Sequence, residues 1–303
     1  MRFSFWPSAA QPWPEILEPC RHAEATGWDG LWIADHFLPF AGDVDEPMLE
    51  AWSALTALAV EVPRVRLGTL VCGNTYRHPA VLANQAATTD VVAGGGRVVL
   101  GIGAGWQENE HSAYGIELGS VRWRLDRFEE ACSILRSLLR EERTDHLGEH
   151  YTLTDAPMQP KSGGTAPMPL LVGGGGEQRT LRITARYADE WNVWGDPAIL
   201  RHKGAVLDAH CDDVGRDPAE IERSAVALVF LSDDEAWLDR IRGRDIERPH
   251  MIGTPEQLVE VVAEFRDAGV DELIVPDFSL GGGQRRLDTM DTFLTEVAAE
   301  FRS

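Results

Sequence analysis

An acid and a histidine stand side by side where a short apolar run ends. Residues 30–33 are apolar on both faces, which predicts a buried parallel strand, and Asp35 and His36 follow it after one alanine. In a barrel of alternating strands and helices, catalytic side chains lie at the carboxyl ends of the strands. An Asp–His pair at such a place can bind a polar ligand and transfer a proton near neutral pH. The alternative is that Asp35 caps the following segment and His36 is an ordinary surface residue.

Two glycine-rich segments follow later predicted strands. In the first, residues 101–106, Trp106 stands where a dinucleotide-binding fingerprint would need its third glycine. These glycines either let a ligand approach the backbone or form a tight corner of a barrel. The second is a run of four glycines at 173–176, followed by a helix expected to begin near Glu177. Backbone N–H groups and the helix dipole make this run a candidate phosphate site, with Gln178 and Arg179 as added donors. The alternative is a flexible loop.

Four tryptophans, at positions 6, 106, 191 and 194, fall near predicted strand ends. Several large rings at one barrel mouth would suit a flat aromatic ligand, although core packing is the better explanation for any single ring. His146 and His150 have the spacing of helical metal ligands, but Gly148 lies between them in a segment of loop composition. No carboxylate cluster completes a metal site, and no Gly-x-Ser-x-Gly motif indicates a serine hydrolase.

The composition is that of a water-soluble protein of 303 residues with 44% hydrophobic residues and a net charge of −21. Such a charge disfavours nucleic acid and anionic membrane surfaces as partners. The four cysteines show no CxxC pair, which favours reduced thiols. No apolar run approaches the roughly 18 residues of a membrane span, and the N-terminus lacks the apolar core of a signal peptide. We therefore expect a cytoplasmic protein.

Strand-like and helix-like segments alternate along the chain in eight units. The expected strands are 3–5, 30–33, 66–71, 98–102, 169–172, 191–193, 221–231 and 272–276. The expected helices are 14–26, 50–62, 80–93, 121–140, 177–187, 197–214, 255–268 and 285–301. Eight such units predict an α/β fold of the closed (β/α)8 TIM-barrel type rather than an open sheet. We expect a single domain over residues 1–303, with a surface insertion at about 141–168 that is rich in proline and glycine and contains a short hairpin.

These segments together resemble the bacterial-luciferase-like family, and within it the branch that uses the deazaflavin coenzyme F420. The matching segments are 32–37, 67–71, 77–79, 96–106, 172–176 and 185–192. The resemblance implies a TIM barrel, a homodimer and a cis peptide bond between Leu70 and Val71. In the family, that bond forms a bulge that supports the central ring of the cofactor.

The resemblance also implies roles for individual residues. His36 would face the reacting carbon and the substrate, and Asp35 would hydrogen-bond the deazaflavin. The other implied cofactor contacts are Leu70 and Val71 at the bulge, Gly73, Ala104, Gly105 and Asn109 along the ring and ribityl chain, and Gly175, Gly176, Gln178 and Arg179 at the phosphate.

Two departures from the family's glucose-6-phosphate dehydrogenases bear on the substrate. Trp106 replaces their catalytic glutamate, and Pro197 lies near the position of their phosphate-binding lysine. Both changes disfavour a sugar phosphate, and Trp106, Trp191 and Trp194 favour a small apolar or aromatic substrate. We expect an F420-dependent oxidoreductase that transfers a hydride between cofactor and substrate, with His36 handling the proton. The alternatives are an FMN-dependent monooxygenase served by a separate reductase, a non-catalytic flavin-binding protein and, more remotely, a metal-dependent barrel hydrolase.

Overall fold

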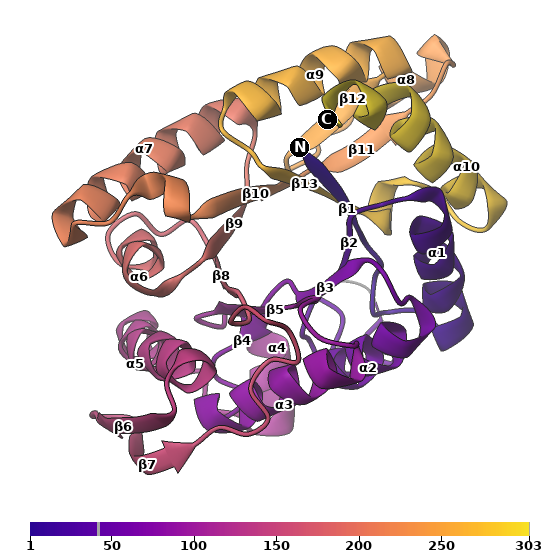
Figure 1. Ribbon diagram of the computed structural model, residues 1–303. Coiled ribbons are helices and arrows are strands. Elements are labelled where there is room, and N and C mark those ends of the chain that lie inside the picture. The colour runs from indigo at the N-terminus through magenta and orange to yellow at the C-terminus, as the bar shows by residue number, and fades with distance from the viewer. Residues whose placement is uncertain (41–42, 303) are drawn as a thin grey trace.

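Eight parallel strands close into a barrel in a computed structural model that describes residues 1–40 and 43–302. The strands are β1 (Arg2–Trp6), β2 (Gly30–Ile33), β3 (Arg66–Thr69), β5 (Val98–Gly103), β8 (Leu170–Gly173), β9 (Glu190–Trp194), β10 (Glu222–Val226) and β13 (Glu272–Pro276). Each pairs with the next, β13 pairs with β1, and the pairing of β3 with β5 completes the ring (Figure 1). The predicted TIM barrel is confirmed.

Helices surround the barrel on the outside (Figure 1). They are α1 (Trp13–Thr26), α2 (Ala51–Glu61), α3 (Pro79–Val92), α5 (Val121–Arg140), α6 (Thr180–Tyr187), α7 (Pro197–Val214), α9 (Pro255–Asp267) and α10 (Gln284–Thr292). Local sequence sets their ends. For example, the Thr254 side chain accepts from the N–H of Gln257 to begin α9, and α1 ends at Gly27 with a φ of 95°. Short helical turns complete the chain: η1 (Pro218–Glu220), η2 (Asp277–Ser279), η3 (Phe293–Val297) and η4 (Ala298–Phe301).

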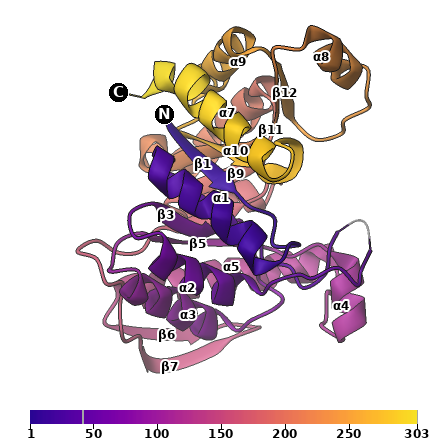
Figure 2. The ribbon, with the colours of Figure 1, turned by 90° about the vertical axis from the view of Figure 1, so that its right-hand side faces the viewer.

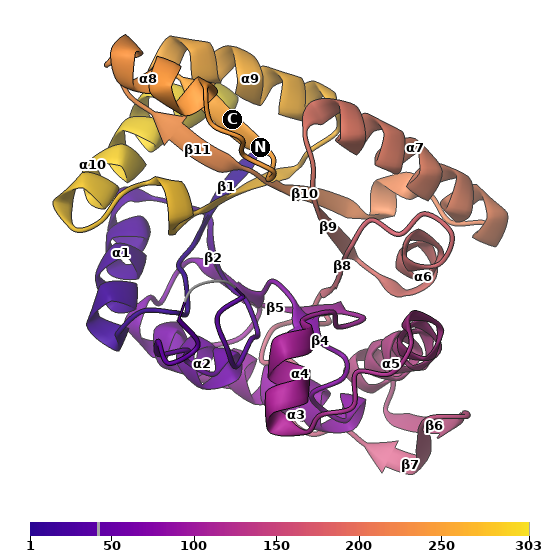
Figure 3. The ribbon, with the colours of Figure 1, turned by 180° about the vertical axis from the view of Figure 1, so that it is seen from behind.

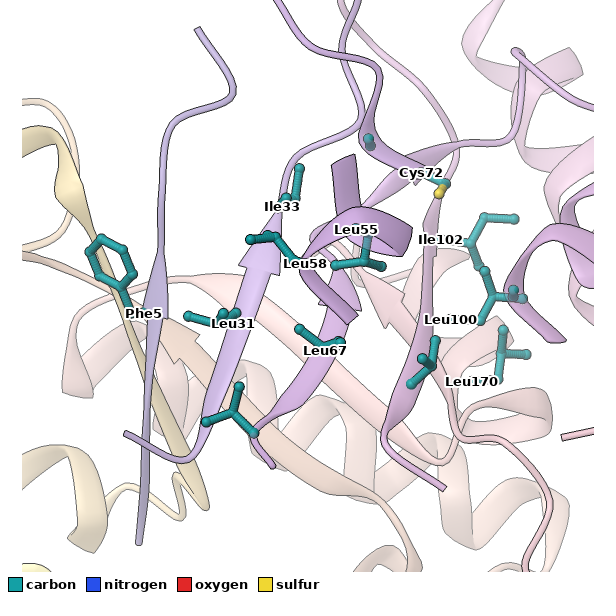
Figure 4. Close-up of a cluster of buried hydrophobic side chains, with 14 of the residues drawn as sticks. Phe5, Leu31, Ile33, Leu55, Leu58, Leu67, Cys72, Leu100, Ile102 and Leu170 are labelled. Atoms are coloured by element: carbon teal, nitrogen blue, oxygen red, sulfur yellow. The ribbon is translucent and has the colours of Figure 1, made fainter. Parts of the chain in front are cut away.

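The core has two layers, because successive strand residues point to opposite faces of the sheet. The outer layer lies between strands and helices, where Leu31 and Leu67 approach Leu55 and Leu58 of α2 (Figure 4). The inner layer fills the barrel. Its buried members are Trp6, Trp32, Leu70, Val99, Leu171, Val226 and Ile274. The barrel is thus packed with side chains below its mouth.

Several elements add to the eight units. They are β4 (Cys72–Gly73), α4 (Glu108–Tyr114), the antiparallel hairpin of β6 (Arg143–Leu147) and β7 (Thr152–Pro157), β11 (Leu228–Leu231), α8 (Glu235–Arg242) and β12 (His250–Gly253). The expected strand 221–231 is interrupted, and β11 pairs in parallel with β12 alone. Helix α4 stands at the end of the barrel opposite the two termini (Figure 2) and lies in front when the barrel is seen from behind (Figure 3).

Three further observations bear on the predictions. The peptide bond between Leu70 and Val71 is cis, as predicted. Helix α6 begins at Thr180 rather than near Glu177, because residues 177–179 form a turn. Within residues 1–40 and 43–302, no helix has the length and apolar character that crossing a membrane requires.

Candidate active site

His36 is paired with a buried carboxylate that the loop after β5 supplies. Its Nδ1 lies 2.8 Å from Oε1 of Glu110, on α4. Glu110 has no exposed surface and also accepts hydrogen bonds from the Tyr76 hydroxyl and from the backbone N–H groups of Phe37 (2.6 Å) and Leu38 (3.2 Å). One carboxylate therefore binds the histidine, the two residues that follow it and the loop after β4.

The electrostatics of this pair fix which imidazole nitrogen carries the proton. Burial opposes ionisation of Glu110, but the hydrogen bonds from His36, Tyr76 and Phe37 outweigh it and lower the pKa of this carboxyl. Burial, reinforced by Glu110, raises the pKa of Tyr76, so its hydroxyl remains a donor. An ionised carboxylate can only accept, so Nδ1 of His36 must donate. In the neutral ring, Nε2 is then free to accept a proton.

Sequence reasoning predicted His36 but missed Glu110. Glu110 lies on the short helix α4, which the sequence analysis did not predict. A usable signal was present, because Glu110 follows a predicted barrel strand closely, and the carboxyl ends of barrel strands meet at one mouth. Its distance of 74 residues from His36 along the chain concealed the contact.

The Asp35 side chain is buried in an ion pair with Arg77. Its carboxylate has no exposed surface and is held by both terminal nitrogens of Arg77, at 2.5 and 3.0 Å. Arg77 also binds Oε1 of Glu50 at 2.5 Å, immediately before α2. Burial raises the pKa of Asp35, with Arg77 acting in the opposite direction. In this structure Asp35 anchors the end of β2, and its predicted contact with the cofactor stays a prediction.

Close backbone packing surrounds the cis peptide bond. A Cβ atom at Gly173 would lie 2.8 Å from both methyl carbons of Val71. Strand β8 can therefore approach Val71 this closely only because residue 173 has no side chain. Gly105 has a φ of +84°, and a Cβ there would lie 2.8 Å from Oγ1 of Thr75. The side chains of Val71, Thr75 and Tyr76 therefore pack directly against the backbone of Gly173, Gly105 and Gly73.

An unpaired buried acceptor also lies beside this backbone. Oδ1 of Asn74 has no hydrogen-bond partner among the described residues, and Asn74 is only 2% exposed. Its backbone N–H donates to Gly103 at the end of β5. By contrast, both amide atoms of Asn109 are engaged, with the carbonyl of Pro39 at 3.0 Å and the N–H of Glu110 at 2.8 Å. Asn109 therefore braces the loop, and its cofactor contact stays a prediction.

The glycine run after β8 exposes backbone donors. The N–H groups of Gly175, Gly176 and Gln178 meet no hydrogen-bond acceptor in the described part of the chain. Gly174 has a φ of 128°, and its carbonyl accepts from the indole N–H of Trp191 at 2.9 Å. Free N–H groups before a helix fit a phosphate.

Arg179 at this run is already paired with helix α5. Its guanidinium lies 2.7 Å from Asp126 and 3.4 Å from Glu129. A phosphate at the glycine run would have to compete with these two carboxylates for the arginine. The predicted phosphate contact of Arg179 stays a prediction.

The tryptophans divide between the mouth and the outer layer. Trp106 is 52% exposed, and its ring stands edge-on to His36 with a centroid separation of 5.6 Å. Trp194 contacts Trp6 at 5.8 Å. The prediction that Trp191 lines the substrate pocket is wrong. Trp191 is 1% exposed and packs among Leu181, Leu207 and Ile221 beneath α6 and α7, because its position along β9 faces the helices.

The sequence profile of the family described as luciferase-like monooxygenase matches residues 1–247. The chain belongs to this family. It is 32% identical over 285 residues to an F420-dependent glucose-6-phosphate dehydrogenase of Amycolatopsis mediterranei, covering 88% of this chain and 81% of that protein. It is 31% identical over 222 residues to an F420-dependent hydroxymycolic acid dehydrogenase of Mycobacterium tuberculosis, covering 73% and 60%.

Solved structures agree on the fold. An F420-dependent secondary alcohol dehydrogenase in complex with an F420–acetone adduct superposes with a TM-score of 0.85 at 22% identity, covering 100% of this chain and 99% of that one. The family and its F420-dependent relatives establish the predicted activity class and cofactor. This luciferase-like protein is an F420-dependent oxidoreductase.

Proposed function

We propose that this oxidoreductase is a dehydrogenase that oxidises the hydroxyl-bearing carbon of a small alcohol, with His36 as the general base. The observation that carries the proposal is the pairing of His36 Nδ1 with the buried Glu110, which leaves Nε2 as a proton acceptor at the mouth. The names of both relatives, which denote dehydrogenases of glucose 6-phosphate and of a hydroxy acid, support it.

The residues at the mouth fit F420, which supplies a hydride acceptor when bound. The free N–H groups of Gly175, Gly176 and Gln178 would hold the phosphate. Gly73, Ala104 and Gly105 would lie along the ring and ribityl chain, beside Leu70 and Val71. Asn74 Oδ1 would accept a hydrogen bond there, because it has no other partner in the described residues.

In the reaction, Nε2 of His36 takes the hydroxyl proton of the alcohol, and the resulting imidazolium keeps its Nδ1–H hydrogen bond to Glu110. The buried carboxylate stabilises that positive charge, because Coulombic attraction is stronger where water is excluded. Trp106 stands edge-on to His36 and would contact a substrate bound beside it. Proton transfer of this kind contributes about 10²- to 10⁴-fold to rate.

For the substrate, we propose an apolar or aromatic body. Trp106 and Trp194 present aromatic surface at the mouth, and Trp106 is largely exposed. Binding of flat apolar groups to such rings is favourable through area burial and ring geometry. Glucose 6-phosphate is the comparison substrate that would contradict this part of the proposal if it were preferred.

The proposal is tested by titrating the purified protein with F420 and with FMN, and then measuring F420 reduction with a panel of secondary alcohols. We expect F420 to bind more tightly than FMN. His36→Ala should keep F420 affinity and lose about 10²- to 10⁴-fold in turnover. Full turnover in that variant would reject His36 as the base.

Tighter FMN binding, with oxygen-dependent product formation, would favour the monooxygenase alternative and its separate reductase. F420 binding without any turnover would favour a flavin-binding protein. The homodimer stays a prediction, which the molar mass in solution would test.

A further inference from the structure

Tyr76 and His36 donate to the same oxygen of Glu110. The Nδ1 atom of His36 lies 2.8 Å from Oε1, and the hydroxyl of Tyr76 donates to that oxygen as well. The other oxygen, Oε2, accepts from the backbone N–H groups of Phe37 and Leu38. Of the other three donors to Glu110, the Tyr76 hydroxyl is therefore the one that shares the oxygen on which the imidazole depends.

The ring of Tyr76 is held by contacts that do not involve its hydroxyl. It stands edge-on to Phe37 and lies tilted against His111, with a centroid separation of 4.9 Å in both cases. Both ring nitrogens of His111 are engaged, with Oγ1 of Thr75 at 2.7 Å and a backbone carbonyl at 2.6 Å. The Tyr76 ring also packs on the backbone of Gly73, where a Cβ atom would lie 2.6 Å from Cε2 of the ring. Loss of the hydroxyl alone should therefore leave the ring in place.

A second donor on one carboxylate oxygen weakens the attraction of that oxygen for the first donor. Each hydrogen bond stabilises part of the negative charge, so less of that charge is available to a neighbouring cation. A buried carboxylate without such a donor would hold the imidazole of His36 as the imidazolium up to a higher pH, and Nε2 would then have no free lone pair. A general base works best when its proton affinity matches the operating pH.

The other charges near His36 are largely balanced. Among residues 1–40 and 43–302, the charged groups that face it are Glu110, from α4, and Asp35, on its own loop. The Asp35 carboxylate is paired with both terminal nitrogens of Arg77. Trp106, which stands edge-on to the imidazole, carries no charge. Glu110 and its donors therefore dominate the electrostatics of His36.

We propose that Tyr76 is a positioning residue that tunes the base: its hydroxyl draws charge from Oε1 of Glu110 and so keeps Nε2 of His36 free to accept a proton near neutral pH. The part that concerns turnover rests on the proposed function. The effect on the protonation of His36 does not, because it arises from the three side chains alone.

The protonation of His36, followed by ¹⁵N NMR from about pH 5 to about pH 9 in the F420-loaded protein, tests the proposal. The spectrum of His36→Ala assigns the signals. Tyr76→Phe keeps the ring and removes the hydroxyl. We expect the midpoint of His36 protonation to rise by about half a pH unit to one unit in this variant, because Oε1 loses one hydrogen bond.

Tyr114→Phe is the matched control. Tyr114 lies on α4 together with Glu110, and its ring stands edge-on to Phe37 at 6.0 Å. Its hydroxyl is not among the four donors to Glu110. This variant should leave the midpoint within about 0.2 of a pH unit.

A second experiment places Tyr76→Phe in the Glu110→Gln background. If the hydroxyl acts through Glu110, its removal should change the midpoint there by less than about 0.2 of a pH unit. An unchanged or lowered midpoint in the single variant Tyr76→Phe, an equal rise in Tyr114→Phe, or a rise that persists in the Glu110→Gln background would overturn the proposal.

Failure of the proposed function gives a different result. If His36 is the base, the acidic limb of the pH profile of F420 reduction should move to higher pH in Tyr76→Phe, by the same amount as the NMR midpoint. A raised NMR midpoint with an unmoved profile, or with no turnover of any alcohol, would reject His36 as the base of the dehydrogenation and retain the tuning by Tyr76.

Discussion

At the scale of the single residue, the site depends on a carboxylate that never needs to touch the substrate. Glu110 accepts four hydrogen bonds, and only one of them comes from His36. Its role is to position the imidazole and fix its tautomer, as the acid hydrogen-bonded to the imidazole does in other histidine bases. The substitution Glu110→Gln keeps the shape but adds a donor, which can reverse the hydrogen bond and place the ring proton on Nε2.

We expect Glu110→Gln to lower turnover by about 10²- to 10⁴-fold, because Nε2 could no longer accept the substrate proton. F420 affinity should change by less than about threefold. The measurement is single-turnover F420 reduction together with an F420 titration. Glu130→Gln is the matched control, since Glu130 also binds a histidine (His146, 3.3 Å) and backbone N–H groups, but on the β6–β7 hairpin. Equal losses in both variants would indicate a structural role only.

The sequence predicts some residues of the site but not all of their contacts. His36 was predictable because it follows a buried strand directly, and the free donors of Gly175 and Gly176 were predictable because a glycine run precedes a helix. The ion pair of Asp35 was not, since its partner Arg77 is 42 residues away. The outward face of Trp191 followed from strand alternation once the boundaries of β9 were known.

At the scale of elements, Arg77 joins the end of β2 to the beginning of α2. It binds the fully buried Asp35 and the half-buried Glu50. Glu50 in turn accepts from the N–H groups of Trp52 and Ser53 in the first turn of α2. This ion-pair triad therefore holds the strand end that presents His36.

We expect Arg77→Met to lower the free energy of unfolding by about 3–5 kcal/mol, because it leaves the Asp35 carboxylate buried without a counter-ion. Chemical denaturation measures the change. Arg122→Met is the control, since Arg122 is 90% exposed and only 3.8 Å from Asp126, and its effect should stay below about 0.5 kcal/mol. Adding Asp35→Asn to Arg77→Met should restore part of the loss. Similar effects of the two single variants would contradict this role of Arg77.

Helix and strand positions followed well from periodicity and caps, whereas short elements did not. The segment of α4 has only seven residues and lacks an apolar stripe, and its place is set by the contacts of Glu110 and Asn109. Residues 225–231 form one uninterrupted apolar run within the expected strand 221–231, and only the pairing of β11 with β12 shows the break. Tertiary contacts determine the position of α4 and the break in this strand, and the local sequence does not indicate those contacts.

At the scale of the whole molecule, an ionic network closes the barrel at the end opposite the site. Arg66 of β3 binds Glu190 of β9 at 2.5 Å and Glu272 of β13 at 2.8 Å, and Trp32 donates to Glu272 at 2.8 Å. Strands far apart in the sequence are thus joined across the interior. The eight-unit pattern made the barrel predictable, but the network required the closed ring.

Burial raises the pKa of Glu190 to about 7, with Arg66 opposing and Glu272 adding to the shift. A carboxyl whose pKa is raised on folding stabilises the protein most at low pH, and that contribution is lost as the pH rises through about 7. Glu190→Gln removes the titration. We expect the stability of this variant relative to the unaltered protein to rise by up to about 3 kcal/mol between about pH 5 and pH 8.

Urea denaturation of both proteins across this pH range measures the difference, in which the other titrating groups cancel. A difference in the free energy of unfolding that does not change with pH would contradict the raised pKa of Glu190.

The most direct test of the central claim is the tautomer of His36, read from long-range ¹H–¹⁵N NMR correlations at about pH 8.5, where an ordinary histidine is neutral. The spectrum of His36→Ala assigns the signals. The structure predicts a protonated Nδ1 and a bare Nε2 in the unaltered protein, and the opposite tautomer in Glu110→Gln. A protonated Nε2 in the unaltered protein would contradict the account, because His36 could then not accept the substrate proton.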